Sequence, residues 1–241
     1  MSTTLRNLNE KYLTEVRVLS APAKRNLYLT AAVLGGVGVL AFAVILRGVL
    51  LNDAPTTIDA PIQAWLNGGR TDVLTGIMIG LAIAFGPVAL PLIILVVVVV
   101  WGIVAKHVWR PLLLAAGTLT GVILAQIITR AVGRDRPPTD LMLFGTDTTF
   151  SFPSGHVLGA CNFLLLLTYL VFSRRRNPRA RAAVFVLVGL LIVAAAVSRV
   201  YLGYHWATDA LASVSLSLII LGAVIALDTH HTVRVSEAPS R

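Results

Sequence analysis

Six long runs of apolar residues constrain the fold of this chain more than any other feature. They cover roughly residues 28–51, 73–105, 111–132, 154–172, 182–198 and 209–228. Each reaches or approaches the length of about 17–25 residues that an α-helix needs to cross a bilayer. Only 13% of the residues are charged and 56% are hydrophobic, unlike the composition of soluble domains. The sequence therefore predicts an all-α, polytopic membrane bundle with six transmembrane helices.

The placement of the formal net charge of +9 predicts the orientation of that bundle. If the chain crosses six times, the basic segments before the first run, after the second and after the fourth fall on one side, and the positive-inside rule makes that side cytoplasmic. We therefore expect a cytoplasmic basic segment at 1–27, a six-span domain at 28–228 and a cytoplasmic tail at 229–241. Nucleic-acid binding is not expected, because the charge belongs to no soluble basic domain. The basic residues of these segments are Arg6, Lys11, Arg17, Lys24, Arg25, Lys106, Arg110, Arg174, Arg175, Arg176, Arg179 and Arg181, with Arg234 and Arg241 in the tail.

The run at 73–105 is the longest and has Gly86-Pro87 and Pro91 in its middle. Two full spans here would give seven crossings and would move the basic loop at 174–181 to the other side. Charge parity favours one long, kinked span, or a re-entrant segment followed by a span.

The first external loop, at about 52–72, contains Ile58, Ile62, Trp65 and Leu66. Their spacing of i, i+4, i+7 and i+8 predicts a short amphipathic helix in the headgroup plane, with an ordinary loop anchored by Trp65 as the alternative. The carboxylates of this loop, Asp53, Asp59 and Asp72, are expected to be solvated.

The third external loop, at about 199–208, carries Ser198-Arg199, then five residues, His205, three residues and Asp209. On a helix, residues four apart share a face, so Asp209 can accept a hydrogen bond from one imidazole nitrogen of His205 and fix its tautomer. The other nitrogen is then free to attack an electrophile. Arg199 can reach the same point, and a guanidinium is the preferred planar partner of a phosphate.

The second external loop ends in Pro153-Ser154-Gly155-His156. Proline and serine suit the start of a helix, and Gly155 leaves the backbone open to close approach. The unpaired N–H groups of a helix N-terminus form an anion site. His156 faces that space and is a candidate to protonate a leaving oxygen.

Three arginines precede this motif, at Arg130, Arg134 and Arg136, and Pro137 follows the last of them. Arg136 is the best candidate for a phosphate clamp, and the alternative interpretation of Arg134 is a side chain that simply faces water or lipid headgroups. Six crossings place Arg136, His156 and His205 on the same external face, which predicts one extracytoplasmic site.

These segments resemble the type 2 phosphatidic acid phosphatase superfamily, the lipid phosphate phosphatases related to vanadium haloperoxidases, over roughly 111–228. The second and third motifs of that family match in full, at Pro153 to His156 and Ser198 to Asp209. In the first motif Arg136-Pro137 matches, but Thr129 occupies the position of the lysine. Arg130 or Arg134 is expected to supply the missing donor.

The resemblance implies a role for each residue and an enzyme without cofactors. His205 would attack phosphorus to form a phosphohistidine, Asp209 would orient it, and His156 would protonate the leaving oxygen and then activate water. The phosphoryl oxygens would be held by Arg136, Arg199, Ser154 and the Gly155 backbone N–H, with Arg130 as a further donor. The family uses no metal.

The resulting hypothesis is a phosphatase of the cell membrane that acts on a lipid phosphate at the external face, with a polyprenyl (undecaprenyl-type) diphosphate as the favoured substrate. Phosphatidylglycerol phosphate and phosphatidic acid remain alternatives. A lipid phosphotransferase would use the same residues, a vanadium haloperoxidase fits the six spans and small size poorly, and a degenerate lipid-binding protein is supported only by Thr129.

Overall fold

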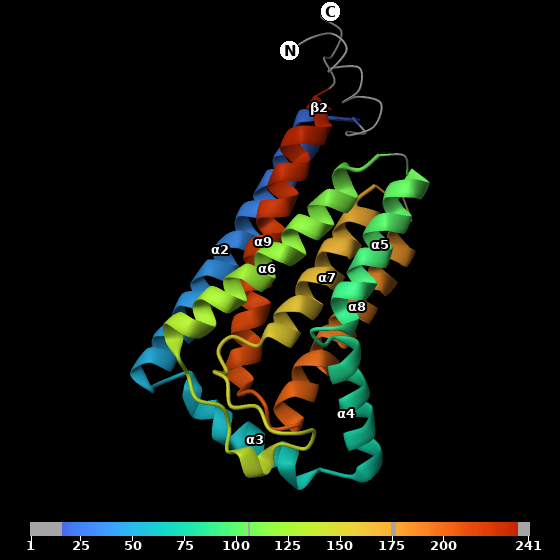
Figure 1. Ribbon diagram of the computed structural model, residues 1–241. Helices are drawn as coiled ribbons and strands as arrows, with labels where there is room; N and C mark the ends of the chain where they lie inside the picture. The colour runs from blue at the N-terminus through green and yellow to red at the C-terminus, as the bar shows by residue number, and fades with distance from the viewer. Residues whose placement is uncertain (1–15, 106, 175–176, 236–241) are drawn as a thin grey trace, which may run out of the picture.

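The structure of the protein is a computed structural model that describes residues 16–105, 107–174 and 177–235 (Figure 1). Most of the predicted basic N-terminal segment (1–15), Lys106, part of the basic loop (175–176) and the end of the tail (236–241) lie outside the described residues. The helices are α2 (Ala21–Leu51), α3 (Asp59–Gly68), α4 (Asp72–Ala84), α5 (Ala89–Ala105), α6 (Trp109–Val132), α7 (Gly155–Phe172), α8 (Pro178–Tyr201) and α9 (Ala207–Thr232), with 3-10 turns η2 (Thr56–Ile58) and η3 (Thr139–Leu141) and strands β1 (Arg17–Leu19) and β2 (Val233–Val235).

The predicted six-span helical bundle is confirmed. Within the described residues, five helices (α2, α6, α7, α8 and α9) are individually long and apolar enough to cross a membrane, and the pair α4 and α5 adds a sixth span. This pair is bent by 50° at a short break that contains Gly86-Pro87. Proline lacks a backbone donor, so a break at this point is expected. Figure 1 shows α4 leading away from the α3 end and α5 continuing from the bend toward the other end, as expected for a kinked span or for a re-entrant segment followed by a span.

The first span begins earlier than the apolar run, at Ala21 rather than near Tyr28. The side chain of Ser20 accepts a hydrogen bond from the Ala23 backbone N–H at 3.4 Å, and Pro22 lies in the first turn. Both are typical of a helix start. Hydropathy locates the apolar part of a helix, whereas capping residues locate its end.

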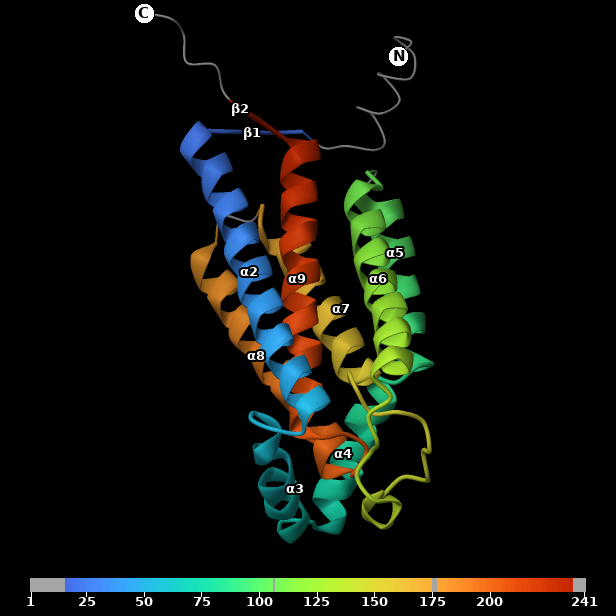
Figure 2. The ribbon, with the colours of Figure 1, turned by 90° about the vertical axis from the view of Figure 1, so that its left-hand side faces the viewer.

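Helices α2 and α9 lie side by side along the bundle in both views (Figures 1 and 2). Two glycines permit this approach. A Cβ atom on Gly38 of α2 would lie 2.6 Å from the Ser215 carbonyl oxygen, and one on Gly222 of α9 would lie 2.6 Å from the Ala31 carbonyl oxygen. Small residues at such crossings are common in membrane bundles. Helices α7 and α9 are the most buried of the five single-helix spans and form the centre.

The two described ends of the chain meet at one end of the bundle, where β1 and β2 pair in parallel (Figure 2). The short helix α3 lies at the other end. The predicted helix of the first loop is therefore present, but it packs on the protein through a polar stripe. Asp59 and Gln63 are buried, whereas Trp65 is 77% exposed.

Candidate active site

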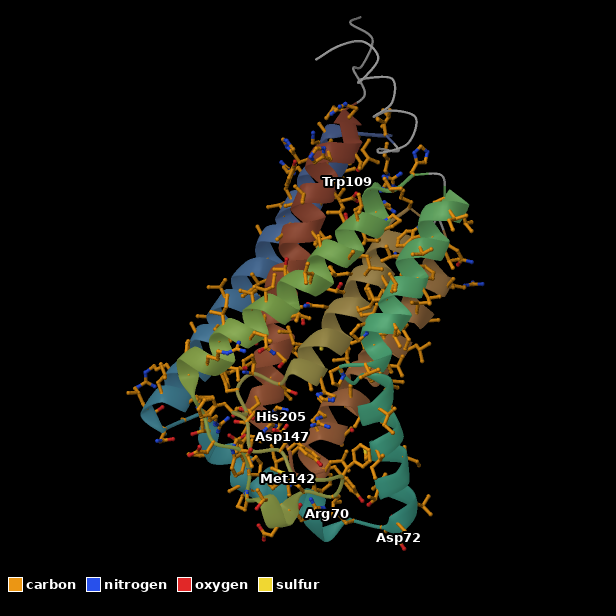
Figure 3. All side chains as sticks on the ribbon, viewed as in Figure 1. Arg70, Asp72, Trp109, Met142, Asp147 and His205 are labelled. Carbon is orange, nitrogen blue, oxygen red and sulfur yellow. The ribbon has the colours of Figure 1, made fainter. Side chains whose placement is uncertain are left out.

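A cavity of about 320 Å³ lies at the α3 end of the bundle and brings the predicted catalytic segments together. Its polar wall comes from the loop before α7, the first turn of α7, the end of α8 and the loop before α9. Figure 3 shows the labelled His205 and Asp147 close to each other at this end. The predicted site residues that line it are Arg136, Gly155, His156, Arg199 and His205, with Thr129, Asp147 and Thr149 as further polar residues.

The first turn of α7 is built by the Pro-Ser-Gly-His motif. Ser154 is the N-cap, and its hydroxyl accepts a hydrogen bond from the Val157 backbone N–H at 3.5 Å. Its own side chain is fully buried and does not line the cavity, while its neighbours Gly155 and His156 do. No atom outside the local backbone lies within 4 Å of a Cβ built on Gly155, so the helix N-terminus is open to a ligand.

The two ring nitrogens of His205 have different surroundings. Nδ1 is bound by a backbone carbonyl on the side away from the cavity, which leaves Nε2 toward the cavity. Its Nδ1 lies 2.8 Å from the Ser151 carbonyl oxygen. A carbonyl can only accept, so Nδ1 carries the proton and the lone pair is on Nε2. Asp209 Oδ2 lies farther from Nδ1, at 3.5 Å. The sequence assigned the tautomer to Asp209 alone, but the nearer acceptor is a backbone carbonyl that no motif reveals.

Burial of His205 lowers the pKa of its imidazole, and the neighbouring Asp209 only partly opposes this effect. The positive charges of Arg199 and Arg136 act in the same direction as burial. A lowered pKa keeps His205 neutral near pH 7, the state in which Nε2 can act as a nucleophile.

Arg136 lies directly beside that nitrogen. Its Nη1 donates to the Tyr204 carbonyl oxygen at 2.7 Å and lies 3.2 Å from Nε2 of His205. Its Nη2 pairs with Asp147 at 2.8 Å. Burial of Arg136 lowers its pKa, with Asp147 opposing. Arg136, the predicted clamp residue, thus lies beside His205 and is paired with a carboxylate that the sequence did not single out.

Arg199 is held at the end of α8 with its guanidinium over the ring of Tyr204, 4.3 Å from the ring centroid. Its side chain is almost fully buried, and its Nε has no hydrogen-bond partner among the described residues. The preceding Ser198 donates from its hydroxyl to the Met78 carbonyl oxygen at 2.8 Å, which ties α8 to α4. A buried guanidinium with an unused donor is a suitable partner for a phosphate.

His156 faces the break between α4 and α5. A Cβ built on Gly86 would lie 3.6 Å from its Nε2. It therefore shares the cavity with His205 while approaching from a different helix.

Three sequence predictions about charged residues are wrong in the structure. Arg130 is exposed, is absent from the cavity lining and donates to the Gln126 carbonyl oxygen at 2.9 Å. Arg134 does not face water but forms ion pairs with Asp59 and Asp209. Asp59 is 4% exposed rather than solvated. Neither arginine takes the place of the missing lysine at the cavity, because Arg130 is not among the lining residues and Arg134 is engaged by Asp59 and Asp209.

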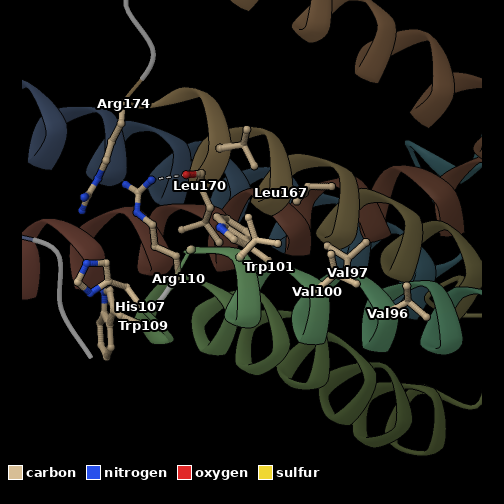
Figure 4. A pocket seen from close by; sticks show the side chains of 13 residues that line it. Val96, Val97, Val100, Trp101, His107, Trp109, Arg110, Leu167, Leu170 and Arg174 are labelled. Atoms are coloured by element: carbon tan, nitrogen blue, oxygen red, sulfur yellow. Dashed lines mark hydrogen bonds between the residues drawn. The ribbon is translucent and has the colours of Figure 1, made fainter. Parts of the chain in front are cut away.

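A larger cavity of about 710 Å³ lies at the opposite end, between α5 and α7 (Figure 4). Valines, leucines and Trp101 line most of it, and Arg110 donates to the Leu170 carbonyl oxygen at its rim. Cavity size therefore does not identify the reactive site. Both cavities are lined by two arginines, and the smaller one is distinguished by its two histidines, His156 and His205.

The comparisons agree with this geometry. The profile of the PAP2 superfamily matches residues 110–232. The chain is 29% identical over 201 residues to "Phosphatidylglycerophosphatase B" of Bacillus subtilis (strain 168), covering 80% of this chain and 94% of that protein. It is also similar to the crystal structure of the first transmembrane PAP2-type phosphatidylglycerolphosphate phosphatase from Bacillus subtilis, with a TM-score of 0.70 and 26% identity over 79% of this chain and 94% of that one.

The chain belongs to the PAP2 superfamily. It is a multi-pass membrane hydrolase of the lipid phosphatase class, as the sequence predicted.

Proposed function

We propose that this protein removes the terminal phosphate from phosphatidylglycerol phosphate through a phosphohistidine on His205. The observation that carries the proposal is the arrangement of this imidazole. Its Nδ1 is bound by the Ser151 carbonyl, and its Nε2 faces the cavity beside Arg136. The substrate is suggested by the name of the Bacillus relative, which covers most of both chains.

In the first step, the lone pair of His205 Nε2 forms a bond to phosphorus while the bond from phosphorus to the lipid oxygen breaks. The phosphoryl oxygens bind to Arg136, Arg199 and the Gly155 N–H. These donors neutralise the negative charge that develops on the oxygens during the transfer. His156 gives its proton to the lipid oxygen. In the second step, His156 accepts a proton from water, the water oxygen bonds to phosphorus, and the P–N bond breaks to release phosphate.

The apolar wall of the cavity supports a lipid substrate. It is formed by α5 and α6 through Leu90, Pro91, Val122 and Ala125. Val122 is half exposed on the bundle surface, so the apolar wall continues to the face that contacts the acyl chains. A headgroup can therefore reach His205 while its chains stay in the bilayer.

The sequence favoured a polyprenyl diphosphate instead. No described contact in the cavity distinguishes a diphosphate from a monoester, while the curated relative is named for phosphatidylglycerol phosphate. A polyprenyl diphosphate is therefore the comparison substrate rather than the proposal.

The test is phosphate release by purified protein in EDTA from both substrates and from phosphatidic acid, with His205→Ala as control. We expect the highest kcat/KM for phosphatidylglycerol phosphate and a loss of at least about 10³-fold in the variant. Vanadate should inhibit, since it adopts the five-coordinate geometry of the transferring phosphorus. Full activity of His205→Ala would refute the mechanism, and a higher kcat/KM for another lipid would refute the substrate. Formation of a new phosphorylated lipid in place of free phosphate would identify a transferase.

We also propose that the active site faces the outside of the cell. The described basic residues that the sequence assigned to the cytoplasm lie at the opposite end from His205, together with the two described chain ends, which supports this orientation. A Thr148→Cys variant should react with an impermeant thiol reagent applied to intact cells, because Thr148 is exposed and the native Cys161 is buried. Labelling only after lysis would reverse the orientation.

A further inference from the structure

The first residue of α3 is a buried carboxylate outside the family motifs. Asp59 is 4% exposed, although it follows a polar loop at the end of the bundle. A buried carboxylate is stable only if it is paired or hydrogen-bonded. Its partners therefore show what this helix is positioned to do.

All the partners of Asp59 lead to the segment that supports His205. Its Oδ1 accepts a hydrogen bond from the Thr208 backbone N–H at 2.9 Å, and its Oδ2 accepts one from the Thr208 hydroxyl at 2.6 Å. Thr208 lies in the first turn of α9, whose N–H groups have no intrahelical acceptor. Asp59 thus caps α9 from another helix.

The same carboxylate also binds Arg134, which continues the chain of contacts. Arg134 Nη2 lies 2.7 Å from Asp59 Oδ2, and its Nη1 lies 2.5 Å from Asp209 Oδ1 and 2.8 Å from the Thr208 hydroxyl. One guanidinium therefore fixes two carboxylates, and its planar fork sets their relative orientation.

Asp209 transmits this arrangement to the imidazole. Its Oδ2 accepts a hydrogen bond from the Trp206 backbone N–H at 2.9 Å and lies 3.5 Å from His205 Nδ1. Two carboxylates and one guanidinium leave one net negative charge behind His205. That charge favours the positive imidazole that forms when Nε2 bonds to phosphorus.

We propose that Asp59 is a positioning residue of the active site: it acts through Arg134 and Asp209 and makes the short helix α3 part of the catalytic apparatus. This inference rests on the proposed role of His205. A carboxylate that only capped α9 would affect stability without affecting the chemical step, so the two roles predict different kinetics.

The primary experiment compares Asp59→Asn with the wild type in the same detergent. The amide oxygen can still accept from Thr208, but the ion pair with Arg134 is lost. We expect kcat to fall about 10- to 100-fold with KM within about twofold, because the substrate contacts remain while the nucleophile is misplaced. Single-turnover formation of the phosphohistidine should slow by the same factor. A wild-type kcat per folded molecule would overturn the proposal.

Two controls separate this result from other failures. Asp53→Asn changes a carboxylate of the same loop that pairs with Arg47 on the surface, and it should leave kcat unchanged. His205→Ala should be inactive. If His205→Ala is active, the proposed function fails. If it is inactive while Asp59→Asn is fully active, only the present inference fails.

Coupling through Arg134 has its own test. The double variant Asp59→Asn/Arg134→Gln should be no less active than Arg134→Gln alone, because both changes interrupt one chain of contacts. Multiplication of the two single losses would contradict action through Arg134.

A milder variant decides the case if Asp59→Asn does not fold. Thr208→Val removes the hydroxyl that both Asp59 and Arg134 contact and preserves the shape of the side chain. We expect a severalfold loss of kcat at constant KM, and a wild-type kcat would overturn the proposal.

Discussion

Each end of the bundle contains a buried arginine paired with a carboxylate of α9, yet only one end is built for catalysis. At the α3 end, Arg134 pairs with Asp209, close to the start of α9. At the other end, Arg110 pairs with Asp228, close to its finish, at 3.0 Å. A buried ion pair therefore does not by itself indicate a reactive site in this protein.

The two ends differ in the side chains that surround the ion pair. Asp228 accepts hydrogen bonds from Trp109, Arg110 and Tyr169, and the adjoining cavity is largely apolar. At the α3 end the ion pairs lie behind His205, and the smaller cavity in front of them is lined by both His156 and His205. The comparison shows that two histidines lining one cavity, beside Arg136 and Arg199, distinguish the catalytic end.

The largest expected effect is on the stability of the folded protein, and it comes from the ion pair of Arg110 and Asp228 at the end opposite α3. Arg110→Gln leaves Asp228 buried without its cation, which should reduce the free energy of unfolding by about 3–5 kcal/mol. The kcat of the folded fraction should stay near the wild-type value. Thermal unfolding in detergent measures the first quantity and phosphate release the second. The double variant Arg110→Met/Asp228→Leu should recover most of the stability, and no recovery would contradict a purely structural pair.

Replacing an arginine at the catalytic end should instead reduce activity and leave stability nearly unchanged. Arg199→Gln is expected to lower kcat/KM about 10²- to 10³-fold, the magnitude typical of one lost donor to a developing anion. The melting temperature should hardly change, since Arg199 lacks a carboxylate partner at hydrogen-bond distance among the described residues. Arg179→Gln, an exposed change on the same helix, is the control. If Arg199→Gln and Arg179→Gln lost activity equally, the loss could not be assigned to the position of Arg199 at the cavity.

The pH dependence tests the neutral state of His205. Because burial lowers its pKa, the imidazole stays neutral until the pH falls below the ordinary value of about 6.5. The acid limb of kcat/KM should therefore have its midpoint below that value. Asp209→Asn removes a group that raises this pKa, so the midpoint should move to still lower pH, along with a loss of rate. A midpoint that moves upward would argue against His205 as the titrating group.

The smallest expected effect concerns Asp147, the carboxylate paired with Arg136. Burial acts to raise its pKa, but hydrogen bonds from Thr149 and the charge of Arg136 lower it overall, so it is an anion in the cavity. Asp147→Asn should free Arg136 and remove a repulsion, which would tighten vanadate binding by a few-fold, as expected for a pair of about 1 kcal/mol that is partly screened by water. Inhibition assays check this, with the exposed Asp140→Asn as control. Weaker inhibition in Asp147→Asn would show that Asp147 instead holds Arg136 in place.

Much of the site was accessible from the sequence because its parts are local patterns. The pair His205 and Asp209 lies at one helix start, and the Pro-Ser-Gly-His segment lies at another. At a helix start, the spacing of residues along the chain fixes their relative positions in space. The wrong predictions concern which way a side chain points around its helix and which residues pair when they are far apart in the sequence. Arg130 is one residue from a cavity-lining position, but its side chain is exposed and donates to the Gln126 backbone instead of lining the cavity. A polar stripe of Asp59, Gln63 and Asn67 at i, i+4 and i+8 was a usable signal that α3 faces the protein.

By itself, the sequence determined the six-span bundle, the break of the run at 73–105 near Gly86-Pro87 and the three segments that converge on the cavity. The thickness of the bilayer and the need to satisfy backbone hydrogen bonds determine the spans from local sequence. The length of each apolar run and the positions of prolines are therefore enough to predict them. Only the tertiary structure decided which charges are paired. Asp59 and Arg134 are 75 residues apart, and the Ser151 carbonyl that holds His205 is a backbone group common to every residue. Contacts of this kind depend on how the helix ends meet in space, and no pattern along the chain encodes that meeting.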